Sequence, residues 1–310
     1  MSFIVGRSGR SVVAAHRGPR DRAPGLWRCW LFVPGADKAA MLGAARSGAD
    51  VLIQELEDFT PPERRAEARA LAPEIFARWR ADGVLAAVRV NPLDGDGRAD
   101  LAAVMRGRPD IVALPKVAEP AQIAALDAEV TQLERVYGIA EGHTRLAPNI
   151  ETARGVMQTY AIAKASPRVV AVIGSTEDMA ADLNAERSPA GDELWYARAR
   201  LHLECRAAGV VSVDCPYTFA DAKAALREAR QARRLGYSAK SAVSPAHVAA
   251  INRALTPSPT ETASALRIVR AFETARAKGK VNVRLGARLV ELPVYLNAKR
   301  LLERARLLGE

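Results

Sequence analysis

Acidic side chains stand at the ends of several apolar runs in this sequence. The run at 51–56 leads into Glu57 and Asp58, and two later runs lead into Glu151 and Asp178. Carboxylates held close together repel one another and are costly to keep ionised. A divalent cation removes the conflict, and Mg²⁺ suits a partial carboxylate shell because it keeps waters and takes further oxygens from a substrate. We therefore expect Glu151 and Asp178 to bind Mg²⁺, with Glu57 or Asp58 acting through water.

Two basic residues follow runs of the same kind. Arg89, in RVNP, presents a fork of N–H donors that suits a carboxylate or a thioester oxygen. Lys116, in LPKV, could instead form a Schiff base, as lysines on barrel strands do in one class of aldolases. An acid at a strand end can also simply cap the next helix, and Glu57 and Asp58 could pair with the arginines at 64 and 65. Spacing leaves these alternatives open, although the acidic cluster favours a metal mechanism.

Several other catalytic patterns do not occur in the sequence. The four histidines form no HxxxH or HxH pair, which argues against zinc. There is no G-x-S-x-G motif, and no G-x-G-x-x-G motif follows the first apolar run. The three cysteines are scattered and form no CxxC pair, which fits a reduced, cytoplasmic setting.

Eight short β-rich runs alternate with helical stretches along most of the chain. Several of the runs are continuously apolar, as strands covered on both faces must be. We expect strands at 29–33, 51–56, 84–90, 110–115, 145–150, 169–174, 210–214 and 238–243. Eight βα units predict an α/β TIM (β/α)8 barrel, with an open doubly wound sheet as the alternative. In a barrel the C-terminal ends of the strands converge on one mouth, which would bring together the acids named above, Arg89 and Asp214 at the end of the seventh run.

Three regions are expected along the chain. Residues 1–25 hold five arginines against one aspartate and lack periodicity, so we expect a disordered basic tail. The barrel would occupy 26–257. A C-terminal helical extension at 258–310 ends in YLNAKRLLERARLL, whose leucines at helical spacing would pack on the barrel or on a neighbouring subunit. Within the barrel, TPPE at 60–63 predicts a helix start with Thr60 as its N-cap.

The net charge of +10 suggests nucleic acid as a partner, but the distribution of charge does not support it. The first 25 residues supply +4 of this charge, and the remaining arginines are mixed with glutamates as on solvated helix faces. We therefore expect no nucleic-acid partner. We also expect no membrane span, because no apolar run reaches about 18 residues.

Short motifs in a fixed order identify a family resemblance. In order along the chain they are RCWLFVPGADKAAM, ELEDFTPPERRAEAR, RVNP, LPKV, IETARGV, GSTEDMAADL and YARARL. Their succession resembles the HpcH/HpaI aldolase/citrate lyase family, in particular citrate lyase beta chains and malyl-CoA lyases, from about residue 28 onward. The resemblance implies a Mg²⁺-dependent carbon–carbon lyase or condensing enzyme. Its substrate would be a β-hydroxyacyl-CoA thioester of the malyl-CoA or citryl-CoA type, and its products a 2-oxo acid and an acyl-CoA enolate.

The resemblance also implies roles for residues of the predicted mouth. Glu151 and Asp178 match the family's metal-binding acids, and Glu151 would also contact the substrate. Arg89 matches the arginine that holds the substrate's oxygens. Glu57 and Asp58 match acids close to the metal and its waters.

Outside the mouth, the resemblance implies a CoA site and a partner subunit. Pro34, Gly35 and Lys38 fall where such proteins approach CoA. Family members are commonly trimers or hexamers, and a C-terminal aspartate closes over a neighbouring active site. Glu291 occupies that place here, as our candidate for proton transfer, and Cys215 stands where glycine is usual. Two other functions remain open: a metal-dependent 4-hydroxy-2-oxo acid aldolase that needs no CoA, and a non-catalytic subunit that binds CoA or an acyl carrier.

Overall fold

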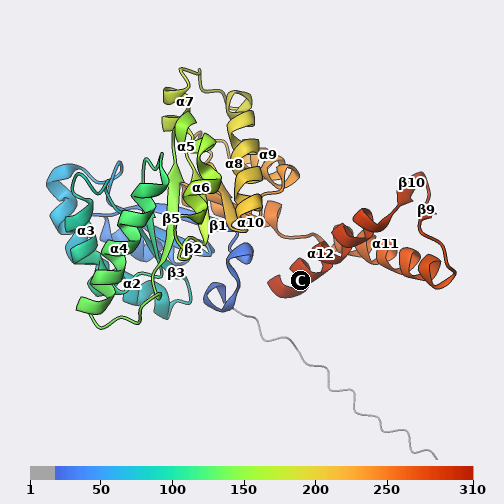
Figure 1. The fold of residues 1–310 in the computed structure, drawn as a ribbon, viewed down its shortest axis with the longest axis horizontal. Helices are drawn as coiled ribbons and strands as arrows, with labels where there is room; N and C mark the ends of the chain where they lie inside the picture. The colour runs from blue at the N-terminus through green and yellow to red at the C-terminus, as the bar shows by residue number, and fades with distance from the viewer. Residues whose placement is uncertain (1–17, 310) are drawn as a thin grey trace, which may run out of the picture. The chain divides into compact units, whose positions relative to one another are not determined.

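The computed structural model describes residues 18–309, which form two compact units (Figure 1). The larger unit spans Pro19–Pro257. The second unit contains the C-terminal residues from Ser258 onward. No helix in the described part of the chain is long and apolar enough to cross a membrane. The three cysteines are buried free thiols.

Eight parallel strands close into a barrel in the larger unit. Each strand pairs with the next one along the chain, and β8 pairs with β1. The strands are β1 (Cys29–Pro34), β2 (Val51–Glu55), β3 (Leu85–Arg89), β4 (Ile111–Leu114), β5 (Arg145–Ile150), β6 (Ala171–Gly174), β7 (Val211–Asp214) and β8 (Ala239–Ala242). The predicted TIM barrel is confirmed, because the pairing of Trp30 with Ser241 closes a ring that an open sheet would leave unpaired.

Helices connect the strands and cover the outside of the barrel. In chain order they are α1 (Lys38–Ala44), α2 (Arg65–Ala81), α3 (Gly97–Val104), α4 (Pro120–Val136), α5 (Ala153–Met157), α6 (Thr159–Lys164), α7 (Glu177–Asp182), α8 (Trp195–Ala208), α9 (Ala222–Leu235) and α10 (Pro245–Leu255). Shorter 3-10 turns are η1 (Pro19–Asp21), η2 (Pro24–Leu26), η3 (Pro62–Arg64), η4 (Met105–Gly107) and η5 (Asp192–Leu194). Side-chain oxygens of Asp37, Thr152 and Ser244 accept hydrogen bonds from the first turns of α1, α5 and α10, which fixes where these helices begin.

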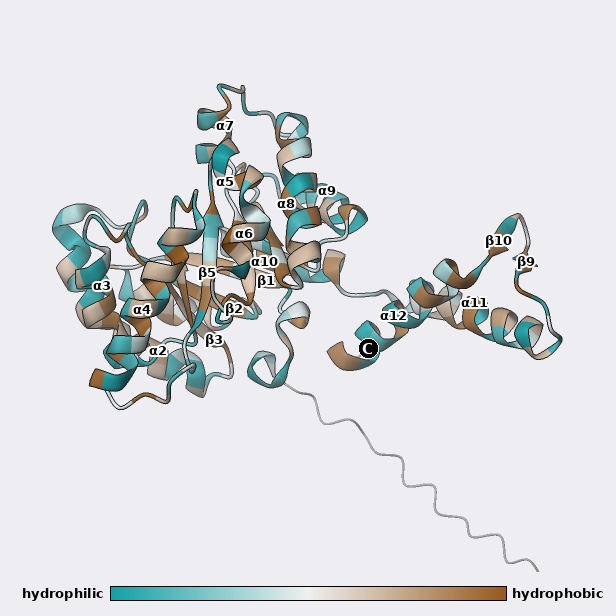
Figure 2. Ribbon diagram, viewed as in Figure 1, coloured by the Kyte–Doolittle hydropathy of each residue, from teal (hydrophilic) through white to brown (hydrophobic). Residues whose placement is uncertain are grey.

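The barrel interior is filled by a cluster of side chains of contrasting size. Trp30, Phe32 and Ile53 contribute bulk from β1 and β2, whereas Ala87 and Ala147 leave room for it on β3 and β5. A larger apolar cluster lies between the strands and the helices. Figure 2 accordingly shows largely hydrophobic strands at the centre and mixed polar and apolar helices around them. The interior is therefore a packed core and not a pore.

The barrel unit begins earlier along the chain than predicted. Residues 1–17 of the expected tail lie outside the described residues, but residues 19–25 do not behave as a tail. Arg20 makes a two-pronged ion pair with Asp110 at 2.6 and 2.9 Å. The indole of Trp27 donates to the Pro19 carbonyl at 2.9 Å. The composition of this segment is basic and polar, but composition alone could not show that Arg20 pairs with the buried Asp110.

The start of α2 also differs from the prediction. Thr60 does not cap the helix, which begins only at Arg65 after η3. Instead the Thr60 hydroxyl donates to the Glu55 carbonyl at 2.5 Å and accepts from the Gly35 amide at 3.1 Å. A Cβ on Gly35 would lie 2.3 Å from the Glu55 carbonyl oxygen, so this close approach requires glycine. The predicted start at 60–63 is therefore wrong, because Thr60 joins the loop after β1 to the end of β2.

The C-terminal unit is a helical hairpin with a small two-stranded sheet. Its elements are α11 (Pro259–Ala277), β9 (Val283–Leu285), β10 (Arg288–Val290) and α12 (Leu292–Leu308), and β9 and β10 are antiparallel. Phe272 of α11 stacks on Tyr295 of α12 with ring centroids 4.7 Å apart. Ser258 and Glu261 form a capping box at the start of α11. The unit thus has its own core, while Leu292 and Leu296 remain exposed.

Candidate active site

The C-terminal ends of the strands surround a cavity of about 370 Å³. Its walls come from strand ends and from the loops that follow them. It is lined by Phe32, Asp58, Phe59, Arg89, Asn149, Gly174, Ser175, Thr176, Glu177, Asp178, Pro216, Thr218 and Val243. The fold therefore brings acids that are 120 residues apart in sequence, Asp58 and Asp178, to one opening.

Arg89, the last residue of β3, is surrounded by carboxylates. Its Nε donates to Glu55 Oε1 at 2.8 Å, and its Nη2 lies 3.2 Å from Glu57 Oε2 and 3.3 Å from Asp58 Oδ2. Its Nη1 lies 3.6 Å from Glu151 Oε1. Although burial opposes the charge, Glu55, Glu57 and Glu151 raise the pKa of Arg89 above its ordinary value. Arg89 is therefore a fixed positive centre, with its Nη1 edge directed toward Glu151.

Glu55 shapes the loop that carries the next two acids. Its Oε1 accepts a hydrogen bond from the Glu57 amide at 2.8 Å, and its Oε2 accepts from the Phe59 amide at 2.5 Å. Together with the bond from Arg89, these contacts satisfy both oxygens of a fully buried carboxylate. Glu55 thus acts as a brace that holds Glu57 and Asp58 beside Arg89.

Lys116 reaches the same acids from the loop after β4. Its Nζ lies 2.5 Å from Glu57 Oε1 and 3.9 Å from Asp58 Oδ1. The hydrogen bond to Glu57 raises the pKa of Lys116 above its ordinary value, so the amine stays protonated. A Schiff base requires a neutral amine, and this pairing therefore disfavours the alternative role of Lys116 as a nucleophile.

Two carboxylic residues on neighbouring strand ends keep oxygens available. Glu151 follows β5, and its Oε1 accepts a hydrogen bond from the side-chain nitrogen Nδ2 of Asn149. Its buried Oε2 has no hydrogen-bond partner among the described residues. The Oδ1 of Asn149 is unpartnered in the same way. Asp178 lies in the first turn of α7 and accepts from the Ser175 hydroxyl at 2.9 Å. Burial, with a contribution from Asp178, raises the pKa of Glu151 to about 7.

The simpler roles considered for these acids are not observed. Arg64 pairs with Glu67 at 2.9 Å. Arg65 pairs with Asp96 at 2.9 Å, so neither arginine neutralises the acids after β2. Asp178 stands inside the first turn of α7 and not at its N-cap position. These acids are therefore left to interact with the basic residues of the mouth or with a ligand.

The oxygens around Glu151 fit a hard divalent cation whose shell the protein supplies only in part. Within residues 18–309 there is no group of three or more His, Cys, Asp and Glu side chains arranged to hold a metal. Mg²⁺ does not need one, because it commonly binds one or two carboxylates and completes its octahedron with waters and substrate. The unpartnered Oε2 of Glu151, close to Asp178, supplies such a donor pair.

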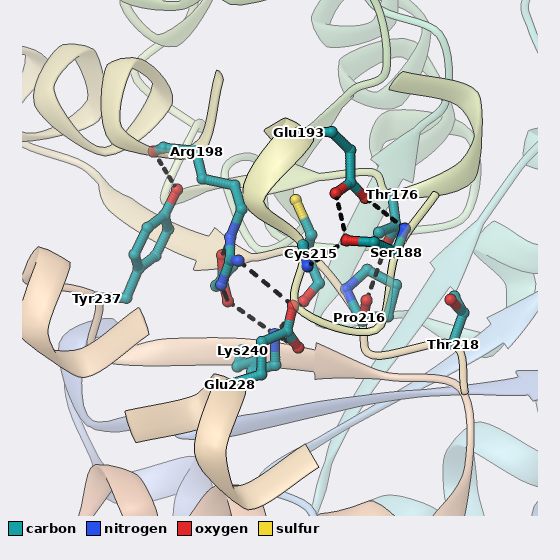
Figure 3. Close-up of polar contacts among 12 residues, drawn as sticks. Thr176, Ser188, Glu193, Arg198, Cys215, Pro216, Thr218, Glu228, Tyr237 and Lys240 are labelled. Atoms are coloured by element: carbon teal, nitrogen blue, oxygen red, sulfur yellow. Dashed lines mark hydrogen bonds and ion pairs between the residues drawn. The ribbon is translucent and has the colours of Figure 1, made fainter. Parts of the chain in front are cut away.

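Asp214, which we expected at the mouth with the other strand-end acids, lies elsewhere. It is fully buried and accepts from Arg198 at 2.8 and 2.9 Å and from Lys240 Nζ at 2.7 Å. Glu228 completes the group, 3.0 Å from Lys240 and 3.3 Å from Arg198 (Figure 3). We call these four residues the buried quartet. Two positive and two negative charges cancel there, so Asp214 is structural.

The buried quartet supports the loops on the β6–β7 side of the mouth. Lys240 also donates to the Cys215 carbonyl, immediately after β7. On the other side of that loop, the Thr176 hydroxyl donates to the Pro216 carbonyl at 2.8 Å (Figure 3). Thr218 donates to Glu177 at 2.6 Å. The loop after β7 is therefore tied to the segment that carries Asp178.

Within the barrel unit, Pro34, Gly35 and Lys38 are not among the residues that line the cavity. Pro34 is exposed at the end of β1, and Gly35 is buried against β2. Lys38 is exposed and pairs with Glu74 of α2 at 2.7 Å. Glu291 is exposed in the C-terminal unit, at the N-cap position of α12, and makes no capping hydrogen bond.

Comparison with known proteins places this barrel and its mouth in a family. The model of HpcH/HpaI aldolase/citrate lyase matches residues 28–245, from just before β1 to the start of α10. The chain belongs to this family. The match covers every strand of the barrel, so it confirms the resemblance found in the ordered motifs.

Relatives within this family are similar over almost the whole chain. Citrate lyase subunit beta of Escherichia coli strain K12 is 34% identical over 284 residues, which are 91% of this chain and 94% of that protein. An L-malyl-CoA/beta-methylmalyl-CoA lyase of Cereibacter sphaeroides is 31% identical over 307 residues, covering 91% and 95% of the two chains. These relatives confirm the prediction of a carbon–carbon lyase.

Solved structures agree with this placement. CitE from Mycobacterium tuberculosis, in complex with magnesium, acetoacetate and coenzyme A, superposes with a TM-score of 0.72 at 25% identity. The similarity covers 90% of this chain and 98% of that one. A citrate lyase from Burkholderia xenovorans has the same fold, with a TM-score of 0.81 at 21% identity.

Proposed function

We propose that this protein is a Mg²⁺-dependent carbon–carbon lyase, or the corresponding condensing enzyme, acting on a β-hydroxyacyl-CoA thioester of the malyl-CoA or citryl-CoA type. One observation carries the proposal: Glu151 Oε2, close to Asp178, has no hydrogen-bond partner among the described residues, whereas Glu57 is held in ion pairs with Arg89 at 3.2 Å and Lys116 at 2.5 Å. The CitE structure, with its magnesium and coenzyme A, supports the same reading.

The charge balance of the mouth also favours a divalent cation. Two basic residues, Arg89 and Lys116, face five carboxylates: Glu55, Glu57, Asp58, Glu151 and Asp178. An excess of three negative charges in a largely buried site is costly, and burial raises the pKa of both Glu57 and Glu151. Mg²⁺ held by Glu151 and Asp178 would remove most of that excess.

The residues of the mouth would then have separate roles in the reaction. Mg²⁺, when bound, acts as a Lewis acid that polarises the carbonyl of the oxo acid. Arg89 is held by Glu55, so its Nη1 edge is oriented to bind substrate oxygens and to stabilise an enolate. Glu57 and Asp58 would orient waters next to the cation. Glu291, from another subunit, would move the proton at the enolate carbon.

The proposal includes a CoA site and an assembly. The loop of Pro34, Gly35 and Lys38 would approach the CoA, and the C-terminal unit beginning at Ser258 would pack on a neighbouring subunit. A homotrimer, or a hexamer built from trimers, would supply Glu291 to each mouth. The exposed Leu292 next to Glu291 provides apolar surface for that contact. We expect the protein to work in the cytoplasm on small molecules.

The direct test is Mg²⁺-dependent turnover of malyl-CoA-type and citryl-type thioesters by wild type and Asp178→Ala. We expect the variant to lose at least 100-fold in kcat/KM, since a metal ligand is removed. Asp82→Ala, which removes a surface acid paired with Arg78, is the matched control and should retain full activity. Unchanged turnover of Asp178→Ala would remove the metal role.

The same assay separates the alternative functions. Cleavage of 4-hydroxy-2-oxo acids with no response to any thioester would show a CoA-free aldolase. Saturable CoA binding without turnover of any thioester would show a non-catalytic subunit. Glu291→Ala is expected to lose turnover while CoA binding is retained, and full activity of this variant would exclude its role in proton transfer.

A further inference from the structure

Lys116 has an unusual backbone conformation for a residue with a side chain. Its φ is +53°, in the left-handed region that is unfavourable for residues other than glycine. Ile111 and Ala113 of β4 face the barrel interior, so continuing the strand would turn Lys116 toward the outside. The left-handed conformation instead brings its ammonium to the acids of the mouth. A conformation that costs stability at a site of this kind indicates a functional constraint.

The ammonium of Lys116 and the guanidinium of Arg89 share two carboxylates. Glu57 gives Oε2 to Arg89 at 3.2 Å and Oε1 to Lys116 at 2.5 Å. Asp58 gives Oδ2 to Arg89 at 3.3 Å and Oδ1 to Lys116 at 3.9 Å. Each acid is therefore held from both sides. Half of the Lys116 side chain is exposed, so its position is not enforced by tight packing.

Glu57 is the acid whose position matters most. It is 5% exposed and shares the Arg89 guanidinium with Glu151: Glu57 Oε2 lies 3.2 Å from Nη2, and Glu151 Oε1 lies 3.6 Å from Nη1. If Lys116 were removed, Glu57 Oε1 would lose its nearest partner while remaining buried near Glu151, which meets the same guanidinium. With Oε2 still paired to Arg89, the released Oε1 would be available to the cation as a third protein ligand.

We propose that Lys116 is a positioning residue that keeps Glu57 out of the metal shell, so that coordination positions stay open for the substrate. This inference rests on the proposed function, because it presumes the cation on Glu151 and Asp178. It adds that the ammonium of Lys116 competes with Mg²⁺ for Glu57 and so keeps coordination positions of the metal open. Removing Lys116 then tightens metal binding and slows catalysis, whereas a purely structural role would weaken both.

The test begins with Lys116→Asn, because asparagine tolerates the left-handed conformation and carries no charge. Isothermal titration of Mg²⁺ into the metal-free protein, without substrate, is expected to show about tenfold tighter binding. Turnover of a thioester at saturating Mg²⁺ should fall about tenfold or more. Lys116→Arg should keep the metal affinity near that of wild type. Lys116→Gly provides a second neutral variant with no backbone strain.

Two further variants separate the mechanism from simple electrostatics. Arg108 also has a positive φ, +54°, but it precedes β4 at the opposite end of the barrel, so Arg108→Asn should leave Mg²⁺ binding unchanged. Lys116→Asn added to Glu57→Gln should leave Mg²⁺ affinity at that of Glu57→Gln alone, because the tightening requires the Glu57 carboxylate. Tightening that survives in the double variant would show that loss of charge alone is responsible, and it would overturn the inference.

The outcomes also distinguish this inference from the proposed function. Wild type that binds no Mg²⁺ would overturn both. Wild type that binds Mg²⁺, together with Lys116→Asn and Lys116→Gly variants that bind it equally or more weakly, would overturn the role of Lys116 alone.

Discussion

Replacing Glu151 with glutamine tests the cost of keeping a buried carboxylate ready for a cation. The pKa of Glu151 is raised from 4.5 to about 7, first because the group is buried. A carboxyl whose pKa is raised on folding contributes its full stability below about pH 4.5, and that contribution is lost as the pH rises to about 7. A difference of this size corresponds to about 3 kcal/mol. Glutamine keeps an oxygen for Asn149 but never ionises.

Metal-free Glu151→Gln is therefore expected to be more stable than wild type by about 3 kcal/mol near pH 8, equivalent to a rise in Tm of about 6 °C. Near pH 4.5 the two proteins should differ little. Thermal unfolding across this range in the presence of a chelator measures the difference. Millimolar Mg²⁺ should then stabilise wild type but not the variant, because only wild type has the complete donor pair.

A buried acid with the opposite behaviour provides the control. Although burial opposes it, Arg168 and the amides of Thr144 and Gly142 lower the pKa of Glu134. Glu134→Gln should therefore destabilise the protein at neutral pH. The reasoning about Glu151 would be refuted if Glu151→Gln were less stable than wild type near pH 8, or if the difference between them did not grow with pH.

Asp178→Asn should abolish the rise in Tm that Mg²⁺ gives to wild type, as measured by thermal unfolding with and without the ion. Gly174→Ala should cost about 1–3 kcal/mol in a denaturant titration, since its Cβ would lie 2.8 Å from Cys215 Sγ. Combining it with Cys215→Ala should recover most of the loss. Arg198→Met should cost about 3–5 kcal/mol in the same titration, because Asp214 would keep a buried charge without its main partner.

The barrel could be predicted because its sequence signal is repeated eight times. Each strand is a short β-rich run, and nearly every one is followed by a segment with helical spacing. The alternation within a strand also explains which polar residues reach the mouth. Ile53, Ala87 and Ala147 face the interior, so Glu55 and Arg89, two residues further along β2 and β3, do so as well.

The same alternation could have corrected the expectation for Asp214. Val213 and Ala239 face the barrel interior, so Asp214 and Lys240, their next neighbours, face the helices. A lysine inside the strand AKSA was the sequence signal of a buried ion pair. The partner Arg198 on α8 could not have been found in this way, because contacts between a helix and a strand depend on how the two pack.

The role of Lys116 was beyond reach of pattern alone. A positive φ at a lysine leaves no trace in the sequence, and without it the side chain would be expected outside the barrel. The pairing of Glu57 with Lys116 and Arg89 also depends on three separate strand ends meeting. Composition can show that charges must be balanced in a chain, but not which charge balances which.

The buried quartet has a consequence for how this protein can change over time. The charges of the quartet cancel only when all four residues are present. Loss of any one of Arg198, Asp214, Glu228 and Lys240 would leave a buried charge without a partner. Viable descendants should therefore retain all four or exchange them together for apolar residues. Across many related sequences, the residues at these four positions on β7, β8, α8 and α9 should therefore vary together.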